Sequence, residues 1–186
     1  MTCIVGYVED GVVYMGGDSA GVSGYDLTHR ADSKVFRKGK MVFGFTSSFR
    51  MGNLLRFKLD IPKQKKGVRI YQYMCTDFVD AVIKCLRDNH YAKDGNGQYS
   101  GGVFMVGYKG RLFKIDSDFQ VAESLEVYDA CGCGDSLALG AMYTLEDTFD
   151  VATDPFDRLN TALSAACHFS AGVSEPFNFV STTKDD

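Results

Sequence analysis

The sequence predicts an α+β fold in which β-sheets pack on each other between outer layers of helices. Its elements come in blocks: strands, a helix pair, further strands, a second helix pair and a last strand. A parallel doubly wound sheet would instead require strict alternation of strand and helix. With 186 residues the chain has the length of about one domain. We therefore expect a single domain over residues 1–186.

Runs of β-branched and aromatic residues separated by short turns with glycine predict the strands. Residues 2–8 and 12–18 flank Glu9-Asp10-Gly11, and an Asp-Gly pair is a strong hairpin signal. A loop over 19–33 follows, and a second hairpin then turns at Lys38-Gly39-Lys40. The remaining strands of the prediction are 34–38, 41–46, 103–108, 111–116, about 126–131 and 177–180.

Apolar residues at three- and four-residue spacing predict two pairs of helices. The first pair consists of a helix that begins at Ser47 and a longer helix over 69–89, whose apolar residues fall on one face. The second pair is predicted over about 135–146 and 154–171, because aspartate suits a helix N-cap and proline suits the first helical position.

Composition and charge exclude several classes of protein. The chain carries 20 basic and 24 acidic side chains, and a net charge of -4 does not favour binding to a phosphate backbone. The chain has no run of 18 apolar residues, and acidic residues stand where a signal peptide would need a basic start and an apolar centre. Six cysteines are too sparse for a disulfide-stapled small domain. We therefore expect a cytoplasmic protein with neither a nucleic-acid nor a membrane partner.

Thr2 directly follows the initiator methionine, and its small side chain predicts that Met1 is removed. Thr2 would then carry a free α-amine beside its own hydroxyl, and such an amine can act as the base that activates the hydroxyl. The ordinary pKa of an α-amine, about 7.7–8.0, lies close to neutral pH, where proton transfer is most effective. If the two hairpins lie side by side, Lys34 can supply a cation that lowers this pKa, and Asp18 can hold the charged group in place.

Thr2, Asp18 and Lys34 follow one another at intervals of sixteen residues, within Gly17-Asp18-Ser19 and Ser33-Lys34-Val35. This pattern resembles the N-terminal threonine hydrolases of the proteasome β-subunit type, and within them the HslV peptidase subunits. The segment 42–45, Val-Phe-Gly-Phe, and the segment 132–140, Gly-Cys-Gly-Asp-Ser-Leu-Ala-Leu-Gly, are similar to two further motifs of that family.

The resemblance implies a four-layer αββα sandwich, the fold of N-terminal nucleophile hydrolases, and a role for each matching residue. Thr2 would be both nucleophile and base, Lys34 would tune the amine, and Asp18 would position Lys34. The backbone N–H of Gly44 would stabilise the oxyanion, a contribution of about 3 kcal/mol per donor. Cys133 stands where the family usually has a serine that faces the amine.

The resemblance also implies a threonine endopeptidase that hydrolyses peptide bonds inside a homo-oligomeric ring, with an ATPase unfoldase as partner and no cofactor. Two alternatives remain open from the residues. A noncatalytic ring or scaffold subunit would retain Met1, and an N-terminal nucleophile amidohydrolase would act on small amides.

Other patterns point less clearly to a site. Cys131, Cys133 and Cys167-His168 lack the spacing of a zinc finger or ribbon, so we expect no metal. Gly132-x-Gly134 lacks the third glycine of a dinucleotide-binding turn. The cluster of Lys63, Lys65, Lys66 and Arg69 is typical of a solvated loop, with contact to an acidic partner as the alternative.

Overall fold

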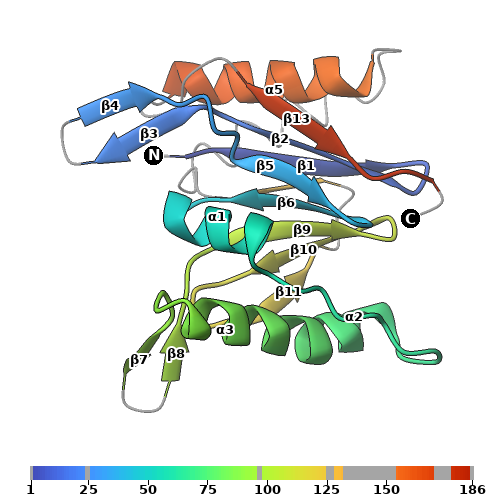
Figure 1. Ribbon diagram of the computed structural model, residues 1–186. Helices are drawn as coiled ribbons and strands as arrows, with labels where there is room; N and C mark the ends of the chain where they lie inside the picture. Colours follow the sequence, from blue (N-terminus) through green and yellow to red (C-terminus); the bar gives the residue numbers. More distant parts are fainter. Residues whose placement is uncertain are drawn as a thin grey trace.

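The computed structural model describes residues 2–23, 26–95, 98–124, 128–131, 154–169 and 177–184. These residues form two antiparallel β-sheets that lie face to face (Figure 1). The first sheet has the order β12-β1-β2-β13 and contains β1 (Ile4–Glu9), β2 (Val12–Gly17), β12 (Tyr128–Cys131) and β13 (Asn178–Ser181). The second has the order β11-β10-β9-β6-β5 and contains β5 (Val35–Lys38), β6 (Met41–Phe45), β9 (Phe104–Tyr108), β10 (Arg111–Ile115) and β11 (Val121–Glu123).

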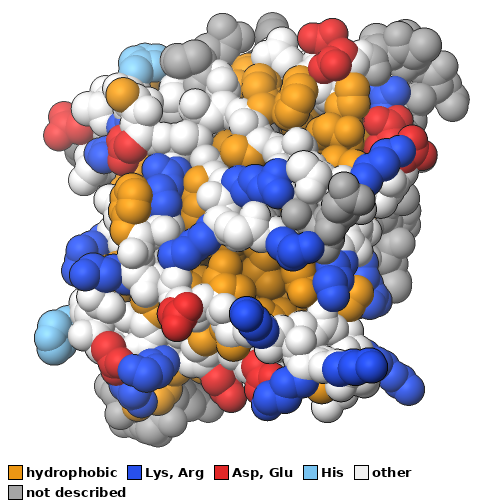
Figure 2. Space-filling model, turned by 45° about the vertical axis from the view of Figure 1, so that its right-hand side comes forward, with side chains coloured by type: hydrophobic (Ala, Val, Ile, Leu, Met, Phe, Trp, Pro, Cys, Tyr) orange, Lys and Arg blue, Asp and Glu red, His pale blue; other side chains and the backbone are white. Residues whose placement is uncertain are grey.

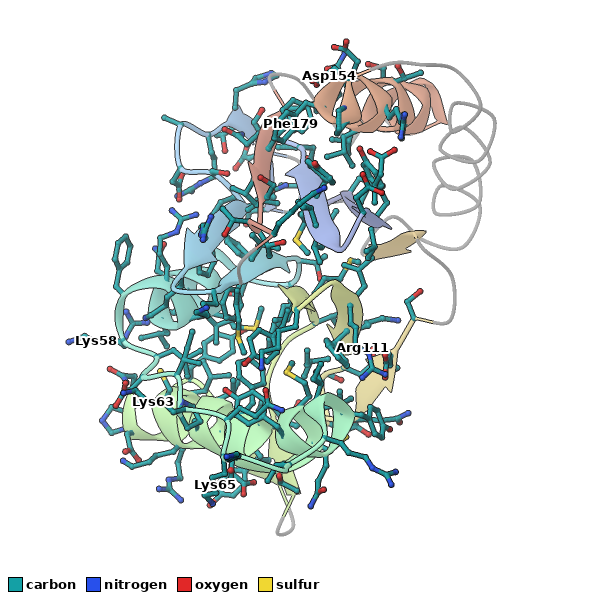
Figure 3. All side chains as sticks on the ribbon, turned by 90° about the vertical axis from the view of Figure 1, so that its right-hand side faces the viewer. Lys58, Lys63, Lys65, Arg111, Asp154 and Phe179 are labelled. Atoms are coloured by element: carbon teal, nitrogen blue, oxygen red, sulfur yellow. The ribbon has the colours of Figure 1, made fainter. Side chains whose placement is uncertain are left out.

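Helices cover the outer face of each sheet in Figure 1. Helix α5 (Pro155–Phe169) lies against β1 and β2, with the Leu163 side chain over Gly16. The second sheet is covered by α1 (Phe49–Phe57) and by the helical run α2 (Ile70–Tyr73), η1 (Met74–Phe78) and α3 (Val79–Asp88). Figure 3 shows the same separation, with Asp154 and Phe179 at one end of the molecule and Lys63 and Lys65 at the other.

Apolar side chains fill the space between the sheets. Those from the first sheet are Ile4, Val13 and Met15, and those from the second are Val35, Val42, Met105 and Leu112. All are at most 2% exposed. Alternate residues of β6, such as Met41 and Phe43 on either side of Val42, pack with the helices instead, as the two faces of a strand require. This mixed arrangement of helices and sheets agrees with the predicted α+β class.

Most of the predicted strands and helices occur within one or two residues of the expected bounds. The predicted loop 19–33 differs, because it contains the hairpin of β3 (Ala20–Ser23) and β4 (Asp26–His29). Every residue of β4 is exposed, so the strand shows no buried alternation that would have marked it. The hairpin of β7 (Lys93–Gly95) and β8 (Gln98–Ser100) was also not predicted.

The predicted helix 69–89 occurs as one continuous helical run with a π-helical turn, η1, in its middle. The Thr76 hydroxyl donates a hydrogen bond of 2.7 Å to the backbone oxygen of Gln72 within this run. A threonine hydroxyl that donates a hydrogen bond to the carbonyl four residues earlier perturbs the regular backbone hydrogen bonding of a helix. The predicted helix 135–146 lies outside the described residues.

The predicted basic cluster lies on the surface. Lys63, Lys65, Lys66 and Arg69 are all exposed, and Lys65 pairs with Asp77 at 3.4 Å. Figure 2 shows Lys and Arg side chains around a hydrophobic area on one face. No helix in the described part of the chain is long and apolar enough to cross a membrane.

Candidate active site

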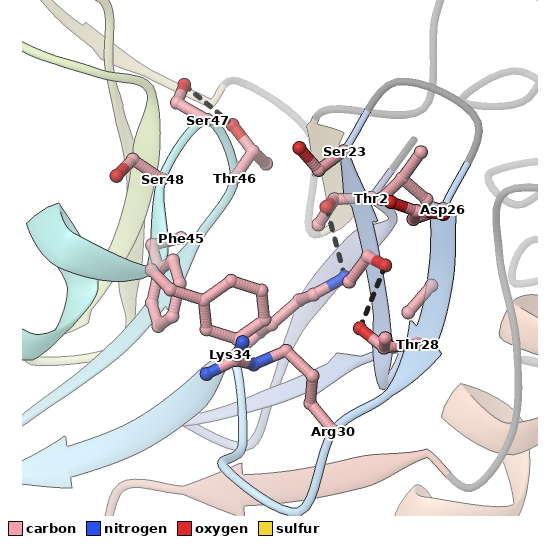
Figure 4. A pocket seen from close by; sticks show the side chains of 14 residues that line it. Thr2, Ser23, Asp26, Thr28, Arg30, Lys34, Phe45, Thr46, Ser47 and Ser48 are labelled. Atoms are coloured by element: carbon pink, nitrogen blue, oxygen red, sulfur yellow. Dashed lines mark hydrogen bonds between the residues drawn. The ribbon is translucent and has the colours of Figure 1, made fainter.

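Four strand ends bring the site residues together. Thr2 precedes β1 and Asp18 follows β2, while Lys34 precedes β5 and Thr46 follows β6. In an antiparallel hairpin the start of the first strand lies beside the end of the second, so each hairpin places two of these residues at the same end of its strands. Because the two sheets are stacked, these strand ends meet at one place, which Figure 4 shows.

Asp18 and Lys34 form a fully buried ion pair at this place. The Lys34 Nζ lies 3.0 Å from both carboxylate oxygens of Asp18, and the two side chains are 1% and 0% exposed. The same carboxylate accepts hydrogen bonds from the backbone N–H groups of Cys3 at 2.8 Å and Ala20 at 2.9 Å. The residue before β1 and the first residue of β3 therefore hold Asp18, and Asp18 in turn fixes the ammonium.

Burial lowers the pKa of the Lys34 ammonium below its ordinary value. The negative charge of Asp18 opposes this effect, and the positive charge of Arg30 adds to it. Lys34 is thus a desolvated cation that gives up its proton more readily than a surface lysine.

The Lys34 Nζ also donates a hydrogen bond of 3.0 Å to the Thr2 hydroxyl oxygen. The geometry therefore places the predicted nucleophile, the predicted tuning cation and its carboxylate in one chain of contacts. Met1 lies outside the described residues, so its removal stays a prediction. The predicted cytoplasmic location also stays a prediction. Cys3, whose N–H contacts Asp18, is disulfide-bonded, whereas Cys75 and Cys85 are free thiols.

A pocket of about 590 Å³ opens over Thr2. Ser23, Asp26 and Thr28 of the β3–β4 hairpin line one side, and the segment 45–49 lines the other. The Lys34 ammonium faces the pocket from below the Thr2 hydroxyl in Figure 4. The walls combine hydroxyl groups with the rings of Phe45 and Phe49, which suits the mixed polar and apolar surface of a peptide.

Two predicted site residues are not placed at this pocket. Gly44 is the last residue but one of β6, and a Cβ there would come within 2.4 Å of Ile4 and 2.7 Å of Met15. Glycine is needed at this position so that the two sheets can approach, and Gly44 does not line the pocket. Cys133 lies outside the described residues, and its predicted role is untested.

Comparison with known proteins gives matches in structure only. No protein-family model and no curated protein matches the sequence. BPH from Thiobacillus denitrificans in complex with epoxomicin matches with a TM-score of 0.76 and 15% identity, over 97% of both chains. BPH alone matches with a TM-score of 0.73 and 16% identity, again over 97% of both chains. Eukaryotic HslV from Trypanosoma brucei matches with a TM-score of 0.65 and 16% identity, over 96% of this chain and 98% of that one.

The chain has the proteasome β-type fold of HslV. The predicted resemblance is therefore confirmed at the level of the fold. Because the match extends over nearly the whole of each chain, the HslV-type fold accounts for both sheets and for the helices that cover them.

Sequence reasoning missed several residues that line the pocket of this HslV-type fold. Ser47 has a backbone φ of 45°, an uncommon conformation for a residue with a side chain, and its hydroxyl accepts a hydrogen bond of 3.0 Å from Val103 N–H. Ser48 caps helix α1 by accepting a hydrogen bond from Arg50 N–H. A serine before a helical pattern is an N-cap signal, so Ser48 was available to a closer interpretation of the sequence.

Arg30 is the second missed group. Its guanidinium forms two hydrogen bonds with the Asp32 carboxylate, at 2.7 and 2.8 Å, and lies 3.9 Å from the centre of the Phe49 ring. No local signal marks Arg30, because it lies in a segment predicted as loop and reaches the pocket only through the stacking of the two sheets. Among the described residues, no group of acidic, histidine or cysteine side chains is arranged to hold a metal ion.

Proposed function

We propose that this protein is a threonine endopeptidase in which Thr2, freed by removal of Met1, is the nucleophile. The observation that carries the proposal is the 3.0 Å contact between Lys34 Nζ and the Thr2 hydroxyl, in a lysine that is itself paired with buried Asp18. Buried ion pairs often contribute little to stability, so stability alone does not explain the Asp18–Lys34 pair. This pair ends on a hydroxyl that opens into a pocket.

In the first half of the proposed reaction the α-amine of Thr2 takes the proton of the Thr2 hydroxyl, and Oγ attacks the carbonyl carbon of a peptide bond. The Lys34 ammonium donates a hydrogen bond to Oγ and stabilises the charge that develops there. When the tetrahedral intermediate collapses, the C–N bond breaks and the amine passes its proton to the leaving nitrogen. The products are a free amine and an ester between the peptide and Thr2.

In the second half the same amine removes a proton from water, and the resulting hydroxide attacks the ester carbonyl. The C–Oγ bond breaks, Oγ regains its proton, and a carboxylic acid is released. One nitrogen therefore acts as base and acid in both halves. Its pKa must lie near the working pH, and the Lys34 cation lowers that pKa because a neighbouring positive charge disfavours a second one.

We assign the oxyanion donors to the backbone N–H groups of Ser47 and Ser48 and not to Gly44. Both serines line the same pocket as Thr2, and they precede helix α1, whose N-terminus favours negative charge. Gly44 lies in the sheet interior instead. Cys133 remains the proposed neighbour of the amine, on the strength of the sequence match alone.

The larger assembly is proposed from the same likeness. We infer a four-layer αββα sandwich forming one domain over residues 1–186, and a homo-oligomeric ring of such subunits that encloses the pocket. An ATPase unfoldase would supply polypeptides to this ring in the cytoplasm. Enclosure of this kind restricts an otherwise unselective peptidase to chains that are fed to it.

The test compares the protein carrying a free Thr2 with its Thr2→Ala variant on a panel of fluorogenic peptides and small amides. We expect peptide turnover that Thr2→Ala lowers at least about 10³-fold, as loss of a nucleophile does in related mechanisms. Thr2→Ser, which keeps the hydroxyl and amine, should retain measurable turnover. Intact mass measured beforehand establishes whether Met1 has been removed.

The other outcomes separate the alternatives. Retention of Met1 together with no turnover would favour the noncatalytic ring subunit, and turnover of small amides alone would favour the amidohydrolase. Undiminished peptide turnover by Thr2→Ala would contradict the proposed nucleophile. Because one BPH structure is in complex with epoxomicin, that compound is a suitable probe, and a mass increase on the free-Thr2 protein but not on Thr2→Ala would support the site.

A further inference from the structure

The segment that carries Lys34 lies at an edge of the second sheet. β5 is the last strand of that sheet in the described part of the chain. The carbonyl of Lys34 points inward and accepts a hydrogen bond of 3.1 Å from Phe45 N–H of β6. The carbonyls of Ser33 and Val35, on either side, alternate with it and point away from β6, as they do at any edge strand.

Arg56 of helix α1 binds both of these outer carbonyls. Its Nη2 lies 2.5 Å from Ser33 O and 3.4 Å from Val35 O. The Ser33 hydroxyl donates a further hydrogen bond of 2.7 Å to Val35 O. Arg56, in the last turn of α1, therefore binds the peptide groups on both sides of Lys34. The first turn of the same helix, with its N-cap Ser48 and with Phe49, forms part of the pocket wall.

Packing fixes the Arg56 side chain in this position. Its guanidinium carbon lies 4.6 Å from the centre of the Phe36 ring, which stacks on Phe43 at 5.0 Å. The Arg56 Nε is buried and has no hydrogen-bond partner among the described residues, and burial lowers the pKa of the guanidinium. A buried N–H without a partner is destabilising. The hydrogen bonds that hold the Arg56 side chain in place are those of Nη2 to the two carbonyls.

We propose that Arg56 is a positioning residue that sets the distance between the Lys34 ammonium and Thr2. The inference rests on the proposed function. If the peptide groups around Lys34 shift, the ammonium moves relative to the hydroxyl and the amine that it tunes, and displacements of about 1 Å can lower a rate 10²-fold. Arg56 touches neither Thr2 nor the pocket and acts only through the backbone of Lys34.

Lys38 supplies a matched control on the same two elements. Its Nζ lies 3.2 Å from Leu55 O and 2.9 Å from Arg56 O, so it joins β5 to the C-terminal turn of α1 in the opposite direction. Lys38, like Arg56, is a partly buried cation that binds two backbone carbonyls. It differs in one respect that matters, because it does not bind the residues that flank Lys34.

The experiment measures two quantities on Arg56→Met, Arg56→Lys and Lys38→Met, each produced with a free Thr2 by cleavage of a fusion. One is the pH profile of kcat/KM for a fluorogenic peptide. The other is the pKa of the Thr2 amine, obtained from the pH dependence of its acetylation by acetic anhydride and detected by mass spectrometry. The second quantity requires no catalytic activity.

We expect Arg56→Met to lower kcat/KM about 10- to 100-fold. Both pH midpoints should move to higher pH, since the Lys34 cation no longer lies close to the amine. Arg56→Lys keeps a positive charge and hydrogen-bond donors at this position, so its kcat/KM and both pH midpoints should lie close to the wild-type values. Lys38→Met should leave both midpoints at the wild-type values.

Wild-type midpoints in Arg56→Met would overturn the inference, as would an equal shift in Lys38→Met, which would assign the effect to the docking of α1 as a whole. If Arg56→Met does not fold, Arg56→Gln is compared with Arg56→Lys, and equal midpoints in these two would overturn it. Failure of the proposed function has a different signature, because the wild type would then show no peptide turnover, or turnover would survive Thr2→Ala, whatever the amine pKa.

Discussion

Lys34 and Asp18 are charged groups that the fold removes completely from water. Such burial is unfavourable unless each charge is paired and its remaining hydrogen bonds are made. Asp18 meets this condition with two backbone N–H groups and the Lys34 ammonium. Lys34 meets it with Asp18 and the Thr2 hydroxyl, so the nucleophile itself completes the hydrogen bonding of the pair.

Asp18→Asn should destabilise the protein by about 3 kcal/mol at pH 7, because it leaves the Lys34 ammonium buried without a counter-charge. The variant should respond to pH more strongly than wild type. Asp18 opposes the effect of burial in wild type, so its loss should lower the pKa of Lys34 further in the folded state. Between that lowered pKa and the ordinary value of 10.5, the unfolded chain binds more protons than the folded chain, so stability rises with pH over this range. Urea unfolding at pH 7 and pH 9.5 measures both effects.

Asp32→Asn is the control for this prediction. Asp32 also pairs with a cation, Arg30, but the two side chains are 34% and 39% exposed. Exposed pairs are worth about 0–1 kcal/mol, so this variant should lose little stability at either pH. Equal losses in the two variants would show that burial does not distinguish the Asp18 pair.

The three residues of this chain of contacts were predictable from the sequence, and the rest of the pocket was not. Thr2, Asp18 and Lys34 stand at the ends of hairpins whose turns carry clear glycine signals, so local patterns already place them. The pocket wall formed by Ser47 and Ser48, and the role of Gly44 between the sheets, depend on how one sheet stacks on the other. No pattern within a single strand records that distance.

At the scale of elements, helix α1 links the pocket to the second sheet. Its first turn lies at the pocket and is capped by Ser48, and its last turn is bound by Lys38 of β5. The sequence predicted the helix from its apolar spacing, but it did not predict these polar links. The hydrogen bonds of Lys38 join residues 17 and 18 positions apart in the chain and form only after the helix has docked.

Lys38→Met should lower the free energy of unfolding by about 1–2 kcal/mol, because two carbonyls of the last turn of α1 lose a charged donor at the end where the helix dipole favours a cation. Thermal or urea unfolding measures the loss, and amide hydrogen exchange should be faster in the last turn of α1 than in wild type. Lys66→Met, at an exposed lysine in the segment between α1 and α2, is the control and should change neither quantity. Unchanged exchange in Lys38→Met would contradict the link.

At the scale of the whole molecule, the fold depends on how closely the two sheets approach. Glycines on the facing strands allow this approach: a Cβ at Gly6, Gly17, Gly44 or Gly107 would meet side chains of the opposite sheet or of a neighbouring strand at 3.1 Å or less. The block order of strands and helices predicted sheets packed on each other, and the two larger sheets have that arrangement. The positions at which glycine is required were not predictable, because each depends on which side chain faces it.

Gly107→Ala should test the contact between the sheets without disturbing the pocket, since Gly107 lies in β9 and does not line the site. The added methyl would lie 2.5 Å from the Val13 side chain of the first sheet and 2.6 Å from that of Val42. Overpacking of this kind is destabilising by about 1–3 kcal/mol. Val13→Ala alone should also destabilise, because it leaves a cavity in a fully buried position.

The double variant Gly107→Ala/Val13→Ala should lose less stability than the sum of the two single variants, because the new methyl occupies part of the space that Val13 leaves. Contacting residues commonly show coupling energies of about 0.5–3 kcal/mol in such cycles, which urea unfolding of the four proteins resolves. Val12→Ala, on the neighbouring position whose side chain points to the other face of β2, supplies the comparison and should be additive with Gly107→Ala. Additive losses in the Val13 cycle would mean that the sheets separate or slide to accept the methyl, and the close approach would then not be a requirement of this fold.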